Sequence, residues 1–464
     1  MTSAVDFPLD VPEMSFTLGG DTLVRRTVHP SGVRILTESM PGARSATLGY
    51  WVTVGSRDEQ PTETGAAGSL GSTHFLEHLL FKGTSQRNAL EIAQSFDAVG
   101  GEHNAMTAKE FTCYYAKVRD TDLSMASSVI ADMVTGSLID PHEFDTEREV
   151  ILEELAMAED DPGDVASERL FSAVLGDHPL GRPIGGDRET IAGATREGVW
   201  QHYRERYSPS TLVISAAGAV NHDALVAEVT SSLDAAASDW SNWSMDAVAA
   251  PTPRRSVPPA SVQRAEAIAE IERPGAQINL MLGVNGLVAG DDRRFAMNIL
   301  NIVLGGGMSS RLFQEIREKR GLAYSTYSFS SAYSDAGLFG LYAGCAPDKA
   351  GQVTGLLRDE FSRLANDGIT DDELRRALGQ LAGSSALALE DSDTRMSRLA
   401  RSEMGLGVFY DLDESLRRLA EVTVDDVQSL AQDLASREFS AVVVGDLSES
   451  KAGLSIRSAL EVSR

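Results

Sequence analysis

The sequence has few cysteines, few basic residues and no long apolar run. Its two cysteines, Cys113 and Cys345, each lie in an apolar, strand-like stretch, so we expect buried free thiols in a reducing compartment rather than a disulfide framework. No apolar run approaches the ~18 residues that span a membrane. The N-terminal residues lack the basic and apolar regions of a signal peptide. We therefore expect a cytoplasmic protein that crosses no membrane.

Basic residues are scarce relative to acidic ones. The chain has 41 Lys and Arg against 68 Asp and Glu, a formal charge of −27. This charge disfavours nucleic acid and anionic membrane surfaces as partners. It would suit a basic peptide ligand, but such a surplus also serves simply to keep a protein surface soluble. The charge thus disfavours these two classes of partner but does not identify the ligand.

The chain consists of two similar halves on either side of a linker. Residues 236–262 are rich in Ala, Ser and Pro and have no sustained period, which is typical of a linker. The order of expected helices and strands in residues 1–235 recurs in residues 263–464. We therefore predict an α+β chain of two duplicated domains, each a mostly antiparallel β-sheet packed with helices on one side.

Three ionisable residues interrupt an apolar segment, GSTHFLEHLLFKGT at residues 71–84. If this segment is a helix, His74 and His78 lie one turn apart on one face, and Glu77 falls between them. A lone histidine here would usually be a hydrogen-bonded core residue, but two histidines and a glutamate would be costly to bury without partners. A divalent metal would satisfy all three, so we predict a metal site.

Two histidines are too few for a catalytic zinc site, which needs a third protein ligand and an open position. The best source of that ligand is a second helix, DPHEFDTEREVILEELAMAEDD. Asp140 as N-cap, Pro141 at the first helical position and Glu143 at the third predict where it begins.

The wheel of this second helix selects two glutamates. Its core-facing side carries four apolar residues, Phe144, Ile151, Leu155 and Ala158. Glu147 and Glu154, two turns apart, fall beside that side, whereas Glu149 and Glu153 fall on the far side. We therefore predict that Glu147 and Glu154 face inward as a metal ligand and its hydrogen-bonding support.

Histidine is missing from the second half of the chain, since all eight histidines lie in the first 222 residues. In a rough internal alignment, the predicted site residues of the first half correspond to positions at or near Met297, Leu300, Asn301, Ala377 and Ser384. We infer that one domain carries the chemistry and that the other has diverged to a binding or structural role.

His-Phe-Leu-Glu-His is the inverted form of the zincin motif. With GSRDE before it and LLFKGT after it, the segment resembles the pitrilysin/insulinase zinc metallopeptidases, most closely mitochondrial processing peptidase and its bacterial relatives. The resemblance covers the chain from about residue 25 to 445. One departure is the stretch SRDEQPTETGAAGSLGST, which is longer than usual before the motif.

The resemblance implies a zinc-dependent endopeptidase that holds one Zn²⁺ per chain. It implies His74, His78 and Glu154, which follows His78 by 76 residues, as the zinc ligands, with water as the fourth. Glu77 would be the general base that takes a proton from water and delivers it to the leaving amine. A further family glutamate falls on Glu147, as support for the ligands.

Substrate contacts also follow from the resemblance. GGEHNAMTAKEFTCYY resembles the family's edge strand that pairs with an extended peptide, which points to Asn104 and Ala105. SSRLFQEIREKRGLAYS resembles the second domain's substrate-binding pair, here Arg317 and Tyr324. On spacing alone, Asn104 could equally be a turn residue, Arg317 a surface residue and Tyr324 a packing residue. We expect His178, in HPLGRPIGG, to be structural.

The family builds a clamshell from four such domains. This chain supplies two, half of the clamshell, so the resemblance implies a homodimer in which Arg317 and Tyr324 face the zinc of the other subunit. Two other functions compete. One is a non-catalytic scaffold or partner subunit of a processing complex, although such members usually lose part of the metal set. The other is a non-haem iron oxygenase, against which a glutamate between the histidines argues.

Overall fold

The computed structural model describes residues 4–19, 22–60, 69–236, 243–255, 258–447 and 452–461. Residues 61–68, in the long stretch before the metal motif, lie outside the described residues, as do 237–242 and 256–257 of the predicted linker. Within the described ranges, no helix is both long and apolar enough to cross a membrane.

The chain folds into two compact units, and neither is continuous in sequence. The first unit comprises residues 1–155, 183–255 and 386–411, and the second comprises 156–182, 256–385 and 412–464. These units differ from the contiguous domains predicted from the sequence, because each half gives one helix to the sheet of the other. Helix α5 (Pro162–Leu175) packs in the second unit and α12 (Ser392–Met404) in the first.

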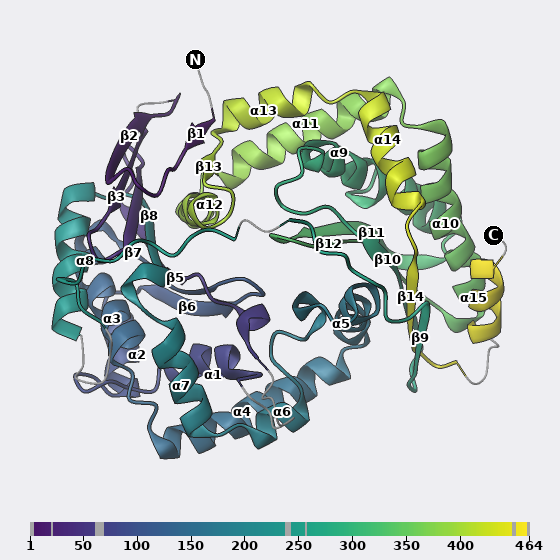
Figure 1. Cartoon of the computed structure of the whole chain (residues 1–464). Coiled ribbons are helices and arrows are strands. Elements are labelled where there is room, and N and C mark those ends of the chain that lie inside the picture. The colour runs from purple at the N-terminus through teal and green to yellow at the C-terminus, as the bar shows by residue number, and fades with distance from the viewer. Residues whose placement is uncertain are drawn as a thin grey trace. The chain divides into compact units, whose positions relative to one another are not determined.

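The first unit is built on a sheet with the strand order β2-β3-β4-β8-β5-β7-β6 among its described residues (Figure 1). The strands are β2 (Glu13–Thr17), β3 (Leu23–Val28), β4 (Arg34–Ser39), β5 (Ser45–Val52), β6 (Glu102–Thr107), β7 (Thr112–Arg119) and β8 (Leu212–Gly218). Neighbouring strands are antiparallel except for β4 and β8. Two short strands, β1 (Val5–Asp6) and β13 (Val408–Phe409), pair with each other.

The second unit repeats this topology. In the part that the structure describes, its sheet has the order β11-β12-β10-β14-β9 (Figure 1), which matches β6-β7-β5-β8-β4 of the first unit. The strands are β9 (Ile268–Glu272), β10 (Ile278–Asn285), β11 (Ala323–Ala332), β12 (Gly337–Cys345) and β14 (Ser440–Gly445). The parallel pair β9–β14 takes the place of β4–β8. The predicted α+β fold of two duplicated, mostly antiparallel domains is confirmed.

Helices cover both faces of each sheet, not one side as the sequence predicts. The helices that begin in the first unit, besides α12, are α1 (Ser72–Leu79), α2 (Ala89–Asp97), α3 (Leu123–Gly136), α4 (Pro141–Asp160), α6 (Arg188–Gly193), α7 (Arg196–Arg206) and α8 (His222–Ala236). Those of the second unit, besides α5, are α9 (Arg294–Gly305), α10 (Ala350–Asp367), α11 (Asp371–Ala388), α13 (Leu412–Ala420), α14 (Val424–Ala435) and α15 (Ala452–Glu461).

Alternation along the central strands explains why each sheet has two apolar faces. In β5, Leu48 and Tyr50 join the core that includes α1 and α3, whereas Trp51 joins the core under α12. In β10, Leu280 joins the core that includes α9 and α10, whereas Met281 packs with residues of α5. The exchanged helices therefore cover the second face of each sheet.

A buried carboxylate ties α12 to the first sheet. Glu403 accepts hydrogen bonds from Nε of Arg26 at 2.9 Å and from Nη2 of Arg254 at 2.9 Å, and it lies 3.5 Å from Nη1 of Arg34. Burial lowers the pKa of Arg34 to about 10. Charges buried without partners are strongly unfavourable. This cluster therefore favours the one position of α12 on the sheet in which Glu403 meets its arginines.

Candidate metal centre

Helix α1 brings the two histidines together, as their spacing predicts. Phe75, Leu76 and Leu79 are fully buried and fix the side of α1 that faces the core. His74 and His78 then project from another side, where their Nε2 atoms lie 3.3 Å apart. Glu77, from the same helix, is half-buried. The apolar residues of the motif thus set the direction in which its ionisable residues point.

Helix α4 supplies the carboxylate. Its predicted start is confirmed, since Oδ1 of Asp140 accepts hydrogen bonds from the backbone N–H groups of His142 and Glu143 at 2.8 and 3.3 Å. Oε2 of Glu154 lies 3.6 Å from Nε2 of His74 and 3.4 Å from Nε2 of His78. One carboxylate oxygen therefore faces both imidazole nitrogens.

The two glutamates selected by the wheel differ in burial. Glu147 is 3% exposed, as the inward orientation predicts. The side chain of Glu154 is 55% exposed, although its Oε2 faces both histidines, as the inward orientation predicts. Glu149 and Glu153 are exposed, as predicted. Of the two carboxylates at the candidate site, that of Glu147 is therefore buried and that of Glu154 is accessible to solvent.

The three ligand atoms fit a zinc ion. Nε2 of His74, Nε2 of His78 and an oxygen of Glu154 lie within 4.8 Å of one another. Tetrahedral zinc with bonds of about 2.0–2.2 Å places its ligand atoms about 3.3–3.6 Å apart, which the distances of 3.3, 3.4 and 3.6 Å match. Among the described residues, His74, His78 and Glu154 form a group of three metal-binding side chains whose ligand atoms converge in this way.

Glu147 fixes the orientation of one histidine. Its Oε2 lies 3.0 Å from Nδ1 of His78, and its Oε1 lies 2.6 Å from Nζ of Lys82. A proton on Nδ1 donates to Glu147 and leaves the Nε2 lone pair directed at His74 and Glu154. Lys82 compensates the charge of this buried carboxylate. Lys82 was not among the residues predicted from the sequence, although its position four residues after His78 was a usable signal.

Replacement of Glu147 tests this support. Glu147→Gln should weaken zinc binding about 10–100-fold, because outer groups that orient a ligand histidine contribute on that scale. Competition with a chromogenic chelator measures the zinc Kd. Glu149→Gln, an exposed change on the same helix, is the matched control and should leave the Kd unchanged. Equal Kd values for the two variants would contradict the assigned role of Glu147.

His74 is held in the form that binds metal. Burial lowers its pKa below the ordinary value of 6.5, and the charge of His78 lowers that pKa further. The carboxylates of Glu154 and Glu77 act in the opposite direction but do not reverse the shift. The neutral imidazole, which has a free lone pair for a metal, is therefore favoured.

The predicted peptide-binding residues lie on β6, at the edge of the first sheet. Ala105 is buried and its side chain joins the core, so only its backbone is available to a ligand. Asn104 is exposed, and its Oδ1 accepts a hydrogen bond from the Ala105 N–H at 2.8 Å. This contact occupies a backbone donor on an edge strand.

Arg317 and Tyr324 contact each other in the second unit. The Arg317 guanidinium lies 4.5 Å from the centre of the Tyr324 ring, and Nη1 donates to the Tyr324 carbonyl at 2.9 Å. Tyr324 is 76% exposed. The β11–β12 register shifts between Ala323 and Ser325, and such a bulge turns the intervening side chain outward. The predicted pair therefore forms one exposed cation–π contact.

Apolar packing replaces the metal cluster in the second copy. Met297 and Leu300 of α9 and Ala377 of α11 are buried in the second core. Asn301 accepts a hydrogen bond from Oγ of Ser328 through its Oδ1 at 2.6 Å. The counterparts of His74, Glu77 and Glu147 in this repeat are therefore apolar core residues.

Other predictions concern cysteines and His178. Cys113 and Cys345 are both buried and free, as predicted. His178 belongs to the second unit, where its Nε2 lies 3.4 Å from Oδ2 of Asp335 and its Nδ1 accepts from the Leu180 N–H at 3.3 Å. Its place outside the metal cluster fits a structural role.

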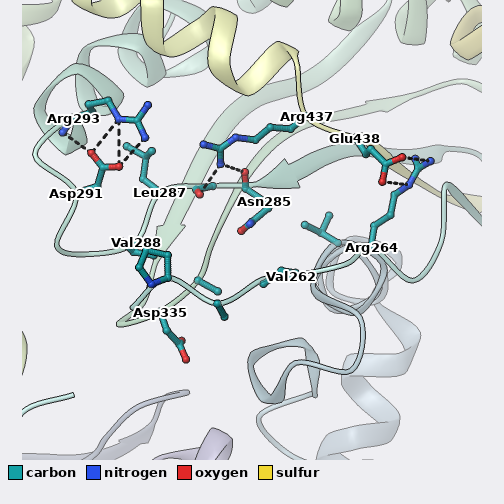
Figure 2. A pocket seen from close by; sticks show the side chains of 15 residues that line it. Val262, Arg264, Asn285, Leu287, Val288, Asp291, Arg293, Asp335, Arg437 and Glu438 are labelled. Atoms are coloured by element: carbon teal, nitrogen blue, oxygen red, sulfur yellow. Dashed lines mark hydrogen bonds and ion pairs between the residues drawn. The ribbon is translucent and has the colours of Figure 1, made fainter. Parts of the chain in front are cut away.

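A cavity of about 430 Å³ lies in the second unit (Figure 2). Arginines that line the cavity form hydrogen bonds and ion pairs with other residues of its lining. Nη1 of Arg437 donates to the carbonyls of Asn285 and Gly286, and Arg293 pairs with Asp291. The residues that line it include none of the predicted site residues, so this cavity is separate from the metal centre.

The helical His-x-x-Glu-His motif is the signature of the inverzincin class. Residues 34–188 match the family described as "Insulinase (Peptidase family M16)", and residues 193–381 match "Peptidase M16 inactive domain". The chain belongs to this insulinase family, M16. The match named inactive covers much of the half that has no histidine.

Relatives and solved structures agree with this assignment. An uncharacterized zinc protease of Streptomyces coelicolor is 49% identical over 92% of this chain and 91% of its own length. The uncharacterized zinc protease YmxG of Bacillus subtilis is 38% identical over 91% of this chain and 98% of its own length. A protease structure from Helicobacter pylori has a TM-score of 0.77 at 21% identity and covers 94% of this chain and all of its own. At that identity the likeness shows the fold.

Proposed function

We propose that this chain is a zinc-dependent endopeptidase that hydrolyses extended peptides. The observation that carries the proposal is the convergence of the two imidazole Nε2 atoms and a Glu154 oxygen, in a motif where Glu77 directly precedes His78. The names of the zinc protease relatives support it. The complete metal set in the first unit favours an enzyme over a scaffold.

The residues divide the chemistry among them. His74, His78 and Glu154 would hold the zinc, and Glu147 orients His78 through Nδ1. When bound, zinc supplies Lewis acidity, which lowers the pKa of a water molecule to about 7 and polarises a carbonyl oxygen. Glu77 accepts the proton of the attacking water and returns it to the nitrogen of the leaving amine.

The substrate class follows from the edge strand. An extended peptide paired with β6 would gain backbone hydrogen bonds at Ala105, because edge strands recognise peptides mainly through the main chain. Such binding depends weakly on sequence. The proposal is therefore a peptidase of broad sequence tolerance, selective for extended chains. The predicted cytoplasmic location stays a prediction.

Metal removal tests the function. Dialysis against a chelator should abolish cleavage of a mixture of unstructured peptides, and added Zn²⁺ should restore it. Metal analysis should find one zinc per chain and no stoichiometric iron, which separates this function from an iron oxygenase. Zinc binding without cleavage would favour the scaffold. Cleavage that survives complete zinc removal would contradict the proposal.

The homodimer can be tested through the Arg317–Tyr324 pair. If each site takes Arg317 from the other subunit, Arg317→Ala and Glu77→Gln chains should complement each other, because a mixed dimer has one site with both residues intact. Refolding the two inactive variants together should restore peptidase activity that neither has alone, with light scattering to measure the dimer. A mixed dimer without activity would contradict the exchange of Arg317 between subunits.

A further inference from the structure

The turn Gly55–Glu59, with the sequence GSRDE, contacts the β6–β7 hairpin. The backbone N–H groups of Ser56 and Arg57 donate to the carbonyls of Ala108 and Lys109 at 3.1 and 3.0 Å. A Cβ on Gly55 would lie 2.4 Å from the Ala108 carbonyl oxygen, so the close approach requires glycine. This turn is therefore fixed to the hairpin that contains the edge strand β6.

The same turn also holds the start of the metal helix. Glu59 is 2% exposed, and its carboxylate accepts hydrogen bonds from the N–H groups of Gly71 and Thr73, both at 2.8 Å. Helix α1 begins at Ser72, so these donors belong to its first turn and its N-cap residue. A carboxylate at this end satisfies free backbone donors and the positive end of the helix dipole.

The local sequence cannot provide this cap. The N-cap residue is Gly71, which has no side chain and a φ of 80°. A Cβ at this position would lie 2.6 Å from Cδ1 of Ile191. A serine or aspartate at the N-cap would be strained at this φ and would have to displace the end of the Ile191 side chain. The carboxylate comes instead from Glu59, twelve residues earlier.

We propose that Glu59 is a positioning residue for the metal centre. His74 follows Thr73 directly, and His78 lies one turn further along α1. By fixing the first turn, Glu59 sets the direction in which both Nε2 atoms face Glu154. Because the turn also holds the β6–β7 hairpin, it links the metal helix to the proposed peptide-binding edge. This inference rests on the proposed function.

Glu59→Gln tests the inference with little change of shape. The NH₂ group of the glutamine would face one of the two backbone N–H donors, Gly71 or Thr73, and cannot accept from it. One of these two hydrogen bonds is therefore lost. We expect zinc affinity to fall about 10–100-fold, as for other groups that orient ligands from outside the coordination shell. The visible spectrum of the Co²⁺-substituted protein should change, and kcat should fall more than KM changes.

Asp161→Asn is the matched control. Asp161 caps α5 by accepting from the N–H groups of Gly163 and Asp164 at 2.7 and 3.3 Å, which is the same chemistry in the second unit. The zinc affinity and the Co²⁺ spectrum of the Asp161→Asn protein should equal those of the wild type. Wild-type zinc affinity and an unchanged Co²⁺ spectrum in Glu59→Gln would overturn the positioning role.

Two further outcomes are separable. A wild-type protein that binds no zinc would contradict the proposed function itself, before any variant is compared. If Glu59→Gln does not fold, Glu59→Asp tests the positioning role instead, because it keeps the negative charge and moves the carboxylate back by one methylene. Weaker zinc binding with wild-type thermal unfolding of the metal-free form would support the proposal, and unchanged zinc binding would overturn it.

Discussion

Replacing Glu77 with glutamine should abolish peptide cleavage and leave zinc in place. Glutamine cannot take a proton from water, and a positioned general base and acid contributes about 10²–10⁴-fold to rate. Because Glu77 serves both proton transfers in the proposed mechanism, kcat should fall at least that far. The metal should remain, since Glu77 is not among the three converging ligand side chains.

The measurement pairs kcat on a fluorogenic peptide with zinc content by atomic absorption. Glu77→Asp is the control for position, since it keeps a carboxylate and moves it back by one methylene. It should retain zinc and more activity than Glu77→Gln. Wild-type turnover in Glu77→Gln would show that another group moves the proton. Loss of zinc from that variant would show that Glu77 belongs to the ligand set.

Replacing Glu154 with glutamine should remove both zinc and activity. A neutral amide is a much weaker zinc ligand than a carboxylate, and a catalytic zinc site requires three protein ligands. We expect the zinc affinity to fall by more than the roughly 10–100-fold expected for Glu147→Gln, because Glu154 acts directly on the metal. Competition with a chromogenic chelator measures the Kd in both variants.

The neighbouring residue provides a close control. Glu153 is exposed on the same turn of α4 and is not one of the three converging ligand side chains, so Glu153→Gln should bind zinc and cleave peptides as the wild type does. An unchanged zinc Kd in Glu154→Gln would exclude Glu154 as a ligand. An equal loss in both variants would show that the charge of α4, not one ligand, governs zinc binding.

The part of the site that depends on spacing within one helix was predictable. His74 and His78 are four residues apart, and the apolar residues around them fix which side faces the core. The wheel of α4 selected Glu147 and Glu154 for the same reason. It did not give the exposure of Glu154. A helical wheel gives the direction of a side chain, but its exposure depends on how far the neighbouring elements cover it.

The parts that depend on contacts distant in sequence were not predictable. Glu59 caps α1 from beyond residues 61–68, and no local pattern marks a cap at that distance. In the sequence, α5 lies in the first half and α12 in the second, yet each packs on the sheet that the other half of the chain forms. Their amphipathic pattern shows that a face is buried and does not show which sheet buries it.

The central claim is that His74, His78 and Glu154 together hold a zinc ion. Anomalous diffraction from a crystal of the zinc-loaded protein, recorded on both sides of the zinc absorption edge, tests this claim most directly. We predict one strong anomalous peak per chain, about 2.0–2.2 Å from Nε2 of each histidine and from a Glu154 oxygen. A zinc-loaded crystal with no peak between these three side chains would contradict the account.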